Sequence, residues 1–435
     1  MALALPRFAA IQSSFHPGKY LRYLVEDGQR HGFLQFSGEE IVSPYGKFEI
    51  ERAKRADEPE EDQSQWSCTL FEPIPVDGGG GARGLYNLHG EAGGHQRPHT
   101  EPILALPPSV TINNPDVFSI FDWESLLILP QHIAFKGDND LYLSARWIER
   151  HEYLQFASSD YGDPTVGNET FITNDGSVRI KNNHFGKFWR RSPNWIWADS
   201  DDSTTNNSDT LFSPVKVGNN IVALRNLGNN NFCKRLTTEG KTSCLNAGET
   251  TISTFARLVV EELVISREIY NVNFRLLDAR IYNQNIITFA SSSAENDKQV
   301  SDTKTLGFSH KDSRSSTWNG SVSLKLGVTT NIQTGIPFVA QGTVEVSTEF
   351  TGEYQWGETV TTEHEVRTEY TTTVPPMSKV TISLLATQGS CDVPFSYTQR
   401  DTLMNGNVVI NNLDDGVYTG INNFNFFYQT KQEEL

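Results

Sequence analysis

Apolar and polar residues alternate along two neighbouring stretches between residues 318 and 357, and this alternation predicts two antiparallel strands. Because the side chains of a strand point to opposite faces in turn, each stretch has one apolar face and one polar face. Each stretch is roughly 9–11 residues long, about the length at which a tilted strand crosses the hydrocarbon core of a bilayer. The apolar positions are Val322, Leu324, Leu326, Val328, Val344, Val346 and Phe350.

The connection between the two stretches contains Ile336 and Phe338 in an apolar segment, residues 336–339, where an exposed turn is ordinarily polar. The flanking sequence from residue 315 to residue 373 is rich in Ser, Thr and Glu, which suits strands that line an aqueous lumen. The pattern therefore predicts a hairpin that enters a membrane and is anchored on the far side by its apolar tip. Half-buried strands of a soluble sandwich alternate in the same way, so that alternative stays open.

A cluster of aromatic and basic residues recurs in the first two thirds of the chain, with copies at residues 19–23, 141–145, 187–191 and 231–235. The last three copies are spaced 44–46 residues apart, measured between Tyr142, Phe188 and Phe232. Three β-rich repeats of this length fit between Ile133 and Glu262. They predict a β-trefoil.

A longer duplication overlies the short one, because residues 34–37 recur at residues 154–157 with an offset of 120 positions. We therefore expect two tandem trefoils, residues 1–123 and 124–262, followed by a β module over residues 263–435. The first trefoil lacks part of its middle repeat, since a charged run at residues 51–65 takes the place of the aromatic–basic cluster. The predicted fold class is all-β.

Composition and charge narrow the possible functions. With 37% hydrophobic, 11% aromatic and 20% charged residues, the chain has the composition of a folded protein. Its formal net charge of −17 disfavours a nucleic-acid partner. The same charge opposes docking to anionic lipid, so approach to a membrane would require a receptor.

The cysteines and the N-terminal residues indicate the cellular compartment in which the protein is expected. Cys68, Cys233, Cys244 and Cys391 have neither metal-ligand spacing nor the density of a disulfide framework, and Cys233 and Cys244 are either a cross-hairpin pair or buried free thiols. Residues 1–11 lack the pattern of a signal peptide, and no run of 18 apolar residues occurs. We expect a cytoplasmic or nucleocytoplasmic protein that enters a membrane only on activation.

The sequence shows no catalytic arrangement. His95 and His99 are four residues apart in a Gly-rich segment, without the further Glu or Cys of a metal site. The glycines at residues 78–81 lack the Lys-Ser/Thr ending of a phosphate-binding loop. The prediction is a protein that is not an enzyme and has no metal or cofactor.

The tandem units resemble the agglutinin domains of amaranthin, a plant lectin built of two β-trefoils. The last third resembles an aerolysin-type pore-forming module, on the basis of the hairpin and its Ser/Thr-rich flanks. The resemblance implies two trefoils followed by an elongated aerolysin-like β module. The matching stretches of the agglutinin domains are residues 19–23, 34–37, 43–51, 66–71, 116–123, 135–137 and 187–197.

The resemblance also implies recognition of galactose or N-acetylgalactosamine (GalNAc), notably of Gal-β-1,3-GalNAc. Because the recognition segment of the first trefoil is the missing one, the prediction moves to residues 191–197 of the second. A tryptophan there would stack on the apolar face of a sugar, and amide or carboxylate groups would bind its hydroxyls. Alternatively, the two tryptophans belong to the core. The candidate carbohydrate-binding residues are Ser192, Asn194, Trp195, Trp197 and Asp199.

These observations predict a lectin coupled to a β-pore-forming module. Glycan binding would gather several copies, which would oligomerise and contribute their hairpins to one barrel. The resemblance implies a role in defence. Two alternatives remain: a lectin whose C-terminal β module only oligomerises or acts as a spacer, and an interaction protein with degenerate sugar sites.

Overall fold

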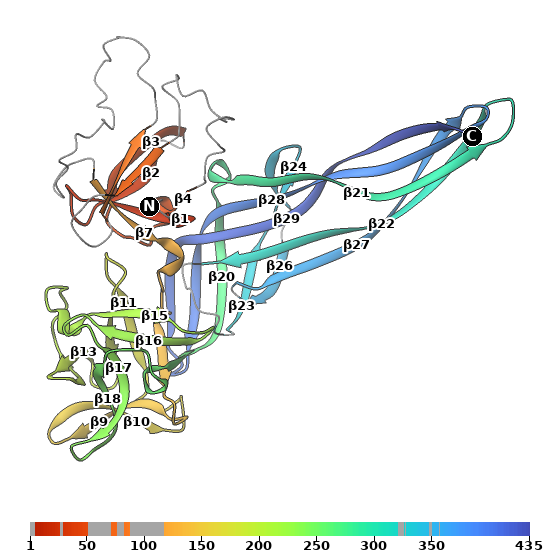
Figure 1. Cartoon of the computed structure of the whole chain (residues 1–435). Coiled ribbons are helices and arrows are strands. Elements are labelled where there is room, and N and C mark those ends of the chain that lie inside the picture. Colours follow the sequence, from red (N-terminus) through yellow and green to blue (C-terminus); the bar gives the residue numbers. More distant parts are fainter. Residues whose placement is uncertain are drawn as a thin grey trace, which may run out of the picture. The chain divides into compact units, whose positions relative to one another are not determined.

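The computed structural model (Figure 1) describes residues 5–26, 29–50, 71–75, 82–87, 117–320, 326, 328–347, 350–355 and 357–435. These residues form β-strands joined by turns and five single-turn 3-10 helices. Within these ranges, no helix has both the length and the apolar character needed to cross a bilayer. The chain divides into two compact units, of which the first ends at Leu263 and the second begins at Val264.

The first unit begins with a seven-stranded antiparallel sheet in the order β3-β2-β1-β7-β6-β5, with β4 beside β1. Ala10, Tyr20 and Ile41 form a small buried cluster there. The charged run expected to replace a repeat lies outside the described residues, so two tandem trefoils remain a prediction. The elements are β1 (Phe8–Ser13), β2 (Tyr20–Glu26), β3 (Gln29–Gly38), η1 (Pro44–Gly46), β4 (Phe48–Glu49), β5 (Phe71–Pro75), β6 (Ala82–Asn87), β7 (Val117–Asp122) and η2 (Trp123–Ser125).

Twelve strands make up the rest of the first unit. They are β8 (His132–Lys136), β9 (Tyr142–Ile148), β10 (His151–Ser158), β11 (Asn168–Ile172), β12 (Val178–Asn182), β13 (Lys187–Ser192), β14 (Trp195–Ser200), β15 (Phe212–Lys216), β16 (Ile221–Asn226), β17 (Phe232–Thr238), β18 (Lys241–Glu249) and β19 (Leu258–Glu262). Two 3-10 turns, η3 (Ser208–Thr210) and η4 (Thr254–Ala256), precede β15 and β19.

The pairing of these strands defines a β-trefoil. Six of them close a barrel, because β8 pairs with β11, β11 with β12, β12 with β15, β15 with β16, β16 with β19 and β19 with β8. The hairpins β9–β10, β13–β14 and β17–β18 contact one another and cap the barrel. Each repeat therefore supplies two barrel strands and one hairpin. The three-repeat prediction for this segment is confirmed.

The spacing of the repeats places equivalent apolar residues inside the barrel. Branched and aromatic side chains of β8, β12 and β16 are buried. Trp189 and Phe212 of the second repeat make an edge-to-face contact, and Trp189 also packs on Phe135 of the first repeat. Two buried amides, Asn168 and Asn182, hydrogen-bond to each other, and Asn168 accepts the indole N–H of Trp189. These buried amides and the buried indole N–H are thus satisfied inside the domain.

The second unit is a module of long strands, most of which belong to one sheet in the order β26-β23-β20-β28-β29-β22-β27, with β21 beside β28. The elements are β20 (Val264–Phe274), η5 (Leu276–Asp278), β21 (Arg280–Asn296), β22 (Asp302–Asn319), β23 (Thr329–Thr334), β24 (Pro337–Ala340), β25 (Thr343–Val346), β26 (Phe350–Gln355), β27 (Thr359–Val374), β28 (Ser378–Leu403) and β29 (Val408–Glu434). Strands β24 and β25 form a separate hairpin.

This module is elongated because its strands are long. β28 spans 26 residues, which corresponds to roughly 85 Å of extended chain at about 3.3 Å per residue. Figure 1 shows β28 and β29 running along the module with β21, β22 and β27. Two separate clusters hold it together, one around Trp318, Phe395 and Tyr418 and the other around Phe308 and Ile382.

A buried ion pair joins two strands of the module. Arg267 on β20 donates two hydrogen bonds of 2.8 Å to the carboxylate of Asp401 on β28, and the two side chains are only 7% and 6% exposed. Gln399 donates a further hydrogen bond to Asp401. The adjacent pair on the same strands, Glu268 and Arg400, is exposed.

Replacing Asp401 with alanine removes the carboxylate that the Arg267 guanidinium binds. We expect the free energy of unfolding of the module to fall by about 3–5 kcal/mol, because breaking a buried ion pair leaves the guanidinium charge buried without the carboxylate that it binds. Urea unfolding followed by circular dichroism measures this loss. The control, Glu268→Ala, removes the exposed pair and costs less than about 1 kcal/mol. Equal losses in the two variants would contradict the prediction.

Candidate functional site

The predicted carbohydrate loop is the tight connection between β13 and β14. Ser192 pairs with Trp195 across the hairpin, so only Pro193 and Asn194 form the turn. This connection positions the candidate residues on two paired strands, whose side chains alternate between the barrel cap and the outside.

The structure places Trp195 in the core of the cap. Its side chain is 6% exposed, its indole N–H donates to Glu239 over 3.3 Å, and its ring packs edge-to-face on Tyr153. Trp197 is half-buried, and its ring stacks on the imidazole of His151 at 4.1 Å between ring centroids. Trp195 therefore has the core position of the alternative interpretation, and its ring is not exposed for stacking on a sugar.

The acidic candidate Asp199 and the nearby Asp201 are each held by a basic residue. The carboxylate of Asp199 accepts two hydrogen bonds from Arg190, of 3.0 and 2.6 Å, and Lys187 binds the carboxylate of Asp201. These pairs form because β13 and β14 bring basic and acidic residues to the same face. Asp199 is thus engaged by the neighbouring strand.

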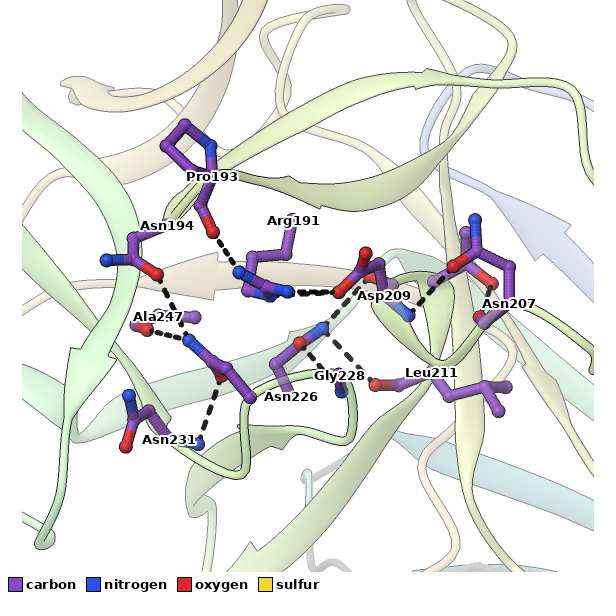
Figure 2. A network of polar contacts seen from close by, with 12 residues as sticks. Arg191, Pro193, Asn194, Asn207, Asp209, Leu211, Asn226, Gly228, Asn231 and Ala247 are labelled. Atoms are coloured by element: carbon purple, nitrogen blue, oxygen red, sulfur yellow. Dashed lines mark hydrogen bonds and ion pairs between the residues drawn. The ribbon is translucent and has the colours of Figure 1, made fainter.

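Asn194 takes part in a polar network that ties the second repeat to the third (Figure 2). Arg191 donates to Asp209 Oδ1 over 2.9 and 2.6 Å and also binds the carbonyl of Pro193. Asn229, on the β16–β17 turn, donates to the Asn194 side chain over 3.2 Å and to the carbonyl of Ala247 over 2.7 Å. The predicted loop is thereby fixed as a junction between repeats.

The three repeats of the trefoil meet at three junctions, and different contacts cross each one. The second junction, between the second and third repeats, has the amide contact between Asn194 and Asn229. The junction between the third and first repeats is a double hydrogen bond from Arg235 to the carboxylate of Asp138. The first junction is aromatic: Trp147 of β9 lies edge-to-face on Phe185 of the β12–β13 turn, with ring centroids 5.6 Å apart. Trp147 is not among the residues predicted from the sequence, because one aromatic residue in an alternating strand does not reveal its neighbours.

The thiols are buried and protonated. Cys233, Cys244 and Cys391 are free and buried, so the free-thiol alternative for Cys233 and Cys244 describes the structure. Burial raises the pKa of Cys244 and that of Cys391 to about 11, which leaves both thiols protonated at neutral pH. A buried neutral thiol is a weak nucleophile. Cys68, His95 and His99 lie outside the described residues.

The predicted membrane hairpin has a different turn from the one expected. β24 pairs with β25 from Ala340 and Thr343 outward, so the turn is Gln341–Gly342, with left-handed φ angles of 48° and 83°. Ile336 and Phe338 lie at the start of the hairpin and in β24, and they do not form its tip. The physical reason is that a two-residue turn requires positive φ, which Gly342 adopts without steric cost.

The remaining hairpin residues are distributed as follows. β23 pairs with β26 and continues the ribbon beyond β24 and β25. Leu326 and Val328 precede β23 and are not in a strand, which corrects the predicted first strand at these two positions. Phe350 begins β26. Val322 and Leu324 lie outside the described residues.

The apolar side of the hairpin is covered by the module's own core. Val339 is 1% exposed, and Ile336 and Val344 pack against the same cluster. The side-chain amide of Asn422 on β29 accepts the N–H of Val339 over 2.8 Å and donates to its carbonyl over 2.9 Å. Asn422 therefore pairs with the backbone of β24 as a neighbouring strand would.

Comparison with known proteins identifies the trefoil. Residues 128–264 match the family model of the agglutinin domain. This segment is an agglutinin domain. Lectins bind carbohydrate without transforming it, and the prediction of a non-enzymatic protein agrees with this family.

The sequence is similar to a curated relative over only part of that protein's length. It is 28% identical to natterin-1 of Thalassophryne nattereri over 161 residues, which are 37% of this chain and 45% of that protein. The chain thus matches less than half the length of this relative. Two solved structures give partial matches. The lamprey immune protein has a TM-score of 0.35 and 11% identity, covering 70% of this chain and 91% of its own. The aerolysin-like protein of Bombina maxima has a TM-score of 0.28 and 12% identity, covering 38% and 99%.

Replacing Asn422 with alanine removes both hydrogen bonds to Val339. We expect amide exchange in residues 337–346 to accelerate by about 30-fold, since two hydrogen bonds contribute about 2 kcal/mol. Hydrogen–deuterium exchange with mass spectrometry measures this, and the β22–β27 ribbon is the internal reference. In the matched variant Asn422→Asp the carboxylate still accepts the N–H of Val339 but cannot donate to its carbonyl. We therefore expect amide exchange to be faster than in the unmodified protein. Unchanged protection in both variants would show that Asn422 does not hold the hairpin.

Proposed function

We propose that this protein is a glycan-binding lectin that brings a membrane-inserting β module to a cell surface. The observation that carries the proposal is the joining, in one chain, of an agglutinin domain to a module that covers an apolar hairpin with its own core. The first part supplies attachment. The second holds apolar surface that a bilayer would accept.

The glycan is proposed to be GalNAc or Gal-β-1,3-GalNAc, as the resemblance to amaranthin implies. A neutral sugar receptor suits a chain with a net charge of −17, because anionic lipid would repel it. Several copies bound to one glycan-rich surface would reach the high local concentration that assembly needs. The protein is proposed to be cytoplasmic or nucleocytoplasmic before activation, with a role in defence.

Insertion is proposed to start from the ribbon that flanks the hairpin. β22 and β27 pair over 16 consecutive residues without a register shift, from Asp302 with Val374 to Thr317 with Thr359. The hairpin lies between these strands in the sequence, so its release would extend the ribbon. Several copies would then close a barrel, because lipid offers no hydrogen bonds to an open strand edge.

A second candidate function is a lectin with a purely structural module. It is favoured by the burial of Val339 and its pairing with Asn422, which are features of a permanent core strand. In that case the module would oligomerise or separate lectin domains, and the hairpin would stay docked.

Dye release from liposomes separates the two functions. We expect release from vesicles that carry a GalNAc-terminated glycolipid, no release from vesicles without it, and inhibition by free GalNAc. Glycolipid-dependent binding without release would favour the structural module.

Replacing Val346 with aspartate tests the insertion face. Val346 is 37% exposed, so the charge is tolerated in the docked state. On the lipid side of a barrel a lysine or arginine costs about 2–4 kcal/mol and an aspartate costs less. Because every copy in the barrel would carry the charge, we expect release to fall at least tenfold with glycan binding unchanged. The control is Thr343→Asp, an exposed position on the other face of β25, which keeps full release. Equal release by the two variants would exclude Val346 from the lipid face.

A further inference from the structure

The first repeat junction of the agglutinin domain exposes an aromatic ring without an evident structural need. Trp147 is 65% exposed, although it lies at a contact between repeats. The two repeats are already joined by the buried hydrogen bond from Asn182 to Asn168, and the other two junctions are also crossed by hydrogen bonds between polar side chains. The exposed indole offers a flat apolar surface that a ligand can cover.

We infer that Trp147 and Phe185 form a carbohydrate-binding site at this junction, with a pyranose stacked on the indole. The inference rests on the proposed lectin function and assigns that function to a place on the domain. A pyranose has an apolar C–H face and a rim of hydroxyls, so an exposed aromatic ring surrounded by polar groups is complementary to it.

The aromatic platform is held rigidly. The backbone N–H of Phe185 donates to Asn182 Oδ1 over 3.1 Å, and that of Gly186 donates to the Asn182 carbonyl over 2.9 Å. Asn182 is fully buried, and its side chain donates to Asn168 and to the carbonyl of Gly167. Phe185 therefore supports Trp147 from a preformed turn, and little conformational entropy is lost when a ligand binds.

Polar side chains surround the platform. Glu152 lies directly opposite Trp147 in the β9–β10 pair, so the carboxylate and the indole share one face. His184 is exposed and contacts the edge of Phe185, with ring centroids 5.2 Å apart, and Asn183 is exposed beside it. A carboxylate, an imidazole and an amide provide the acceptors and donors that hydroxyls require. This mixture favours a sugar over an apolar protein segment.

The test measures binding of the full chain to immobilised Gal-β-1,3-GalNAc and GalNAc, after a glycan panel has shown what the unmodified protein binds. We expect Trp147→Ala to raise the dissociation constant at least tenfold and Trp147→Phe to raise it about threefold. The control Phe255→Ala, which removes another exposed ring of the same domain, keeps full affinity. Thermal melting confirms that each variant folds.

The outcomes separate this inference from the proposed function. If the unmodified protein binds panel glycans and Trp147→Ala binds them equally, the site at the first junction is wrong and the lectin function stands. If the unmodified protein binds no glycan, the lectin function fails. If the unmodified protein binds vesicles that carry no glycolipid and Trp147→Ala does not, the indole contacts lipid. That result would also overturn the inference.

Discussion

Hydrogen bonding at the edges of the strands is the main constraint on this all-β chain, because every strand edge needs a partner. The agglutinin domain meets it by closure: β19 returns to β8 and completes the barrel, so the six barrel strands have neighbours on both sides. The module meets it differently, because its sheet ends at β26 and β27 in the part of the chain that the structure describes. The agglutinin domain is therefore closed on itself, and the module presents edge strands that another copy could pair with.

The same constraint explains how the hairpin is kept. Strands β24 and β25 pair with each other and would otherwise leave the outer edge of β24 without partners. Asn422 offers its side-chain amide to that edge and binds both backbone groups of Val339. Burial of Val339 adds the hydrophobic contribution. The hairpin is thus held by these hydrogen bonds and by packing on the core cluster, which is compatible with release and also with permanent docking.

The three repeats of the agglutinin domain show how one framework carries different chemistry. The barrel and cap repeat faithfully, yet the junctions are an aromatic pair, an amide contact and an ion pair. The junction residues lie at turns and strand ends, where they contribute little to the common core and are free to differ. A symmetric fold thus presents three unlike surfaces, of which one exposes an aromatic ring.

The sequence by itself determined the all-β class, the three-repeat trefoil and the region of the hairpin. These follow from local periodicity, since alternation of two residues defines strand faces and a spacing of 44–46 residues returns equivalent apolar residues to the barrel interior. Tertiary structure alone decided which face of Trp195 is covered, that Arg190 holds Asp199, and that Asn422 meets Val339 from 83 positions away. The physical reason is that alternation assigns a residue to a face, whereas contacts between distant strands decide what lies against that face.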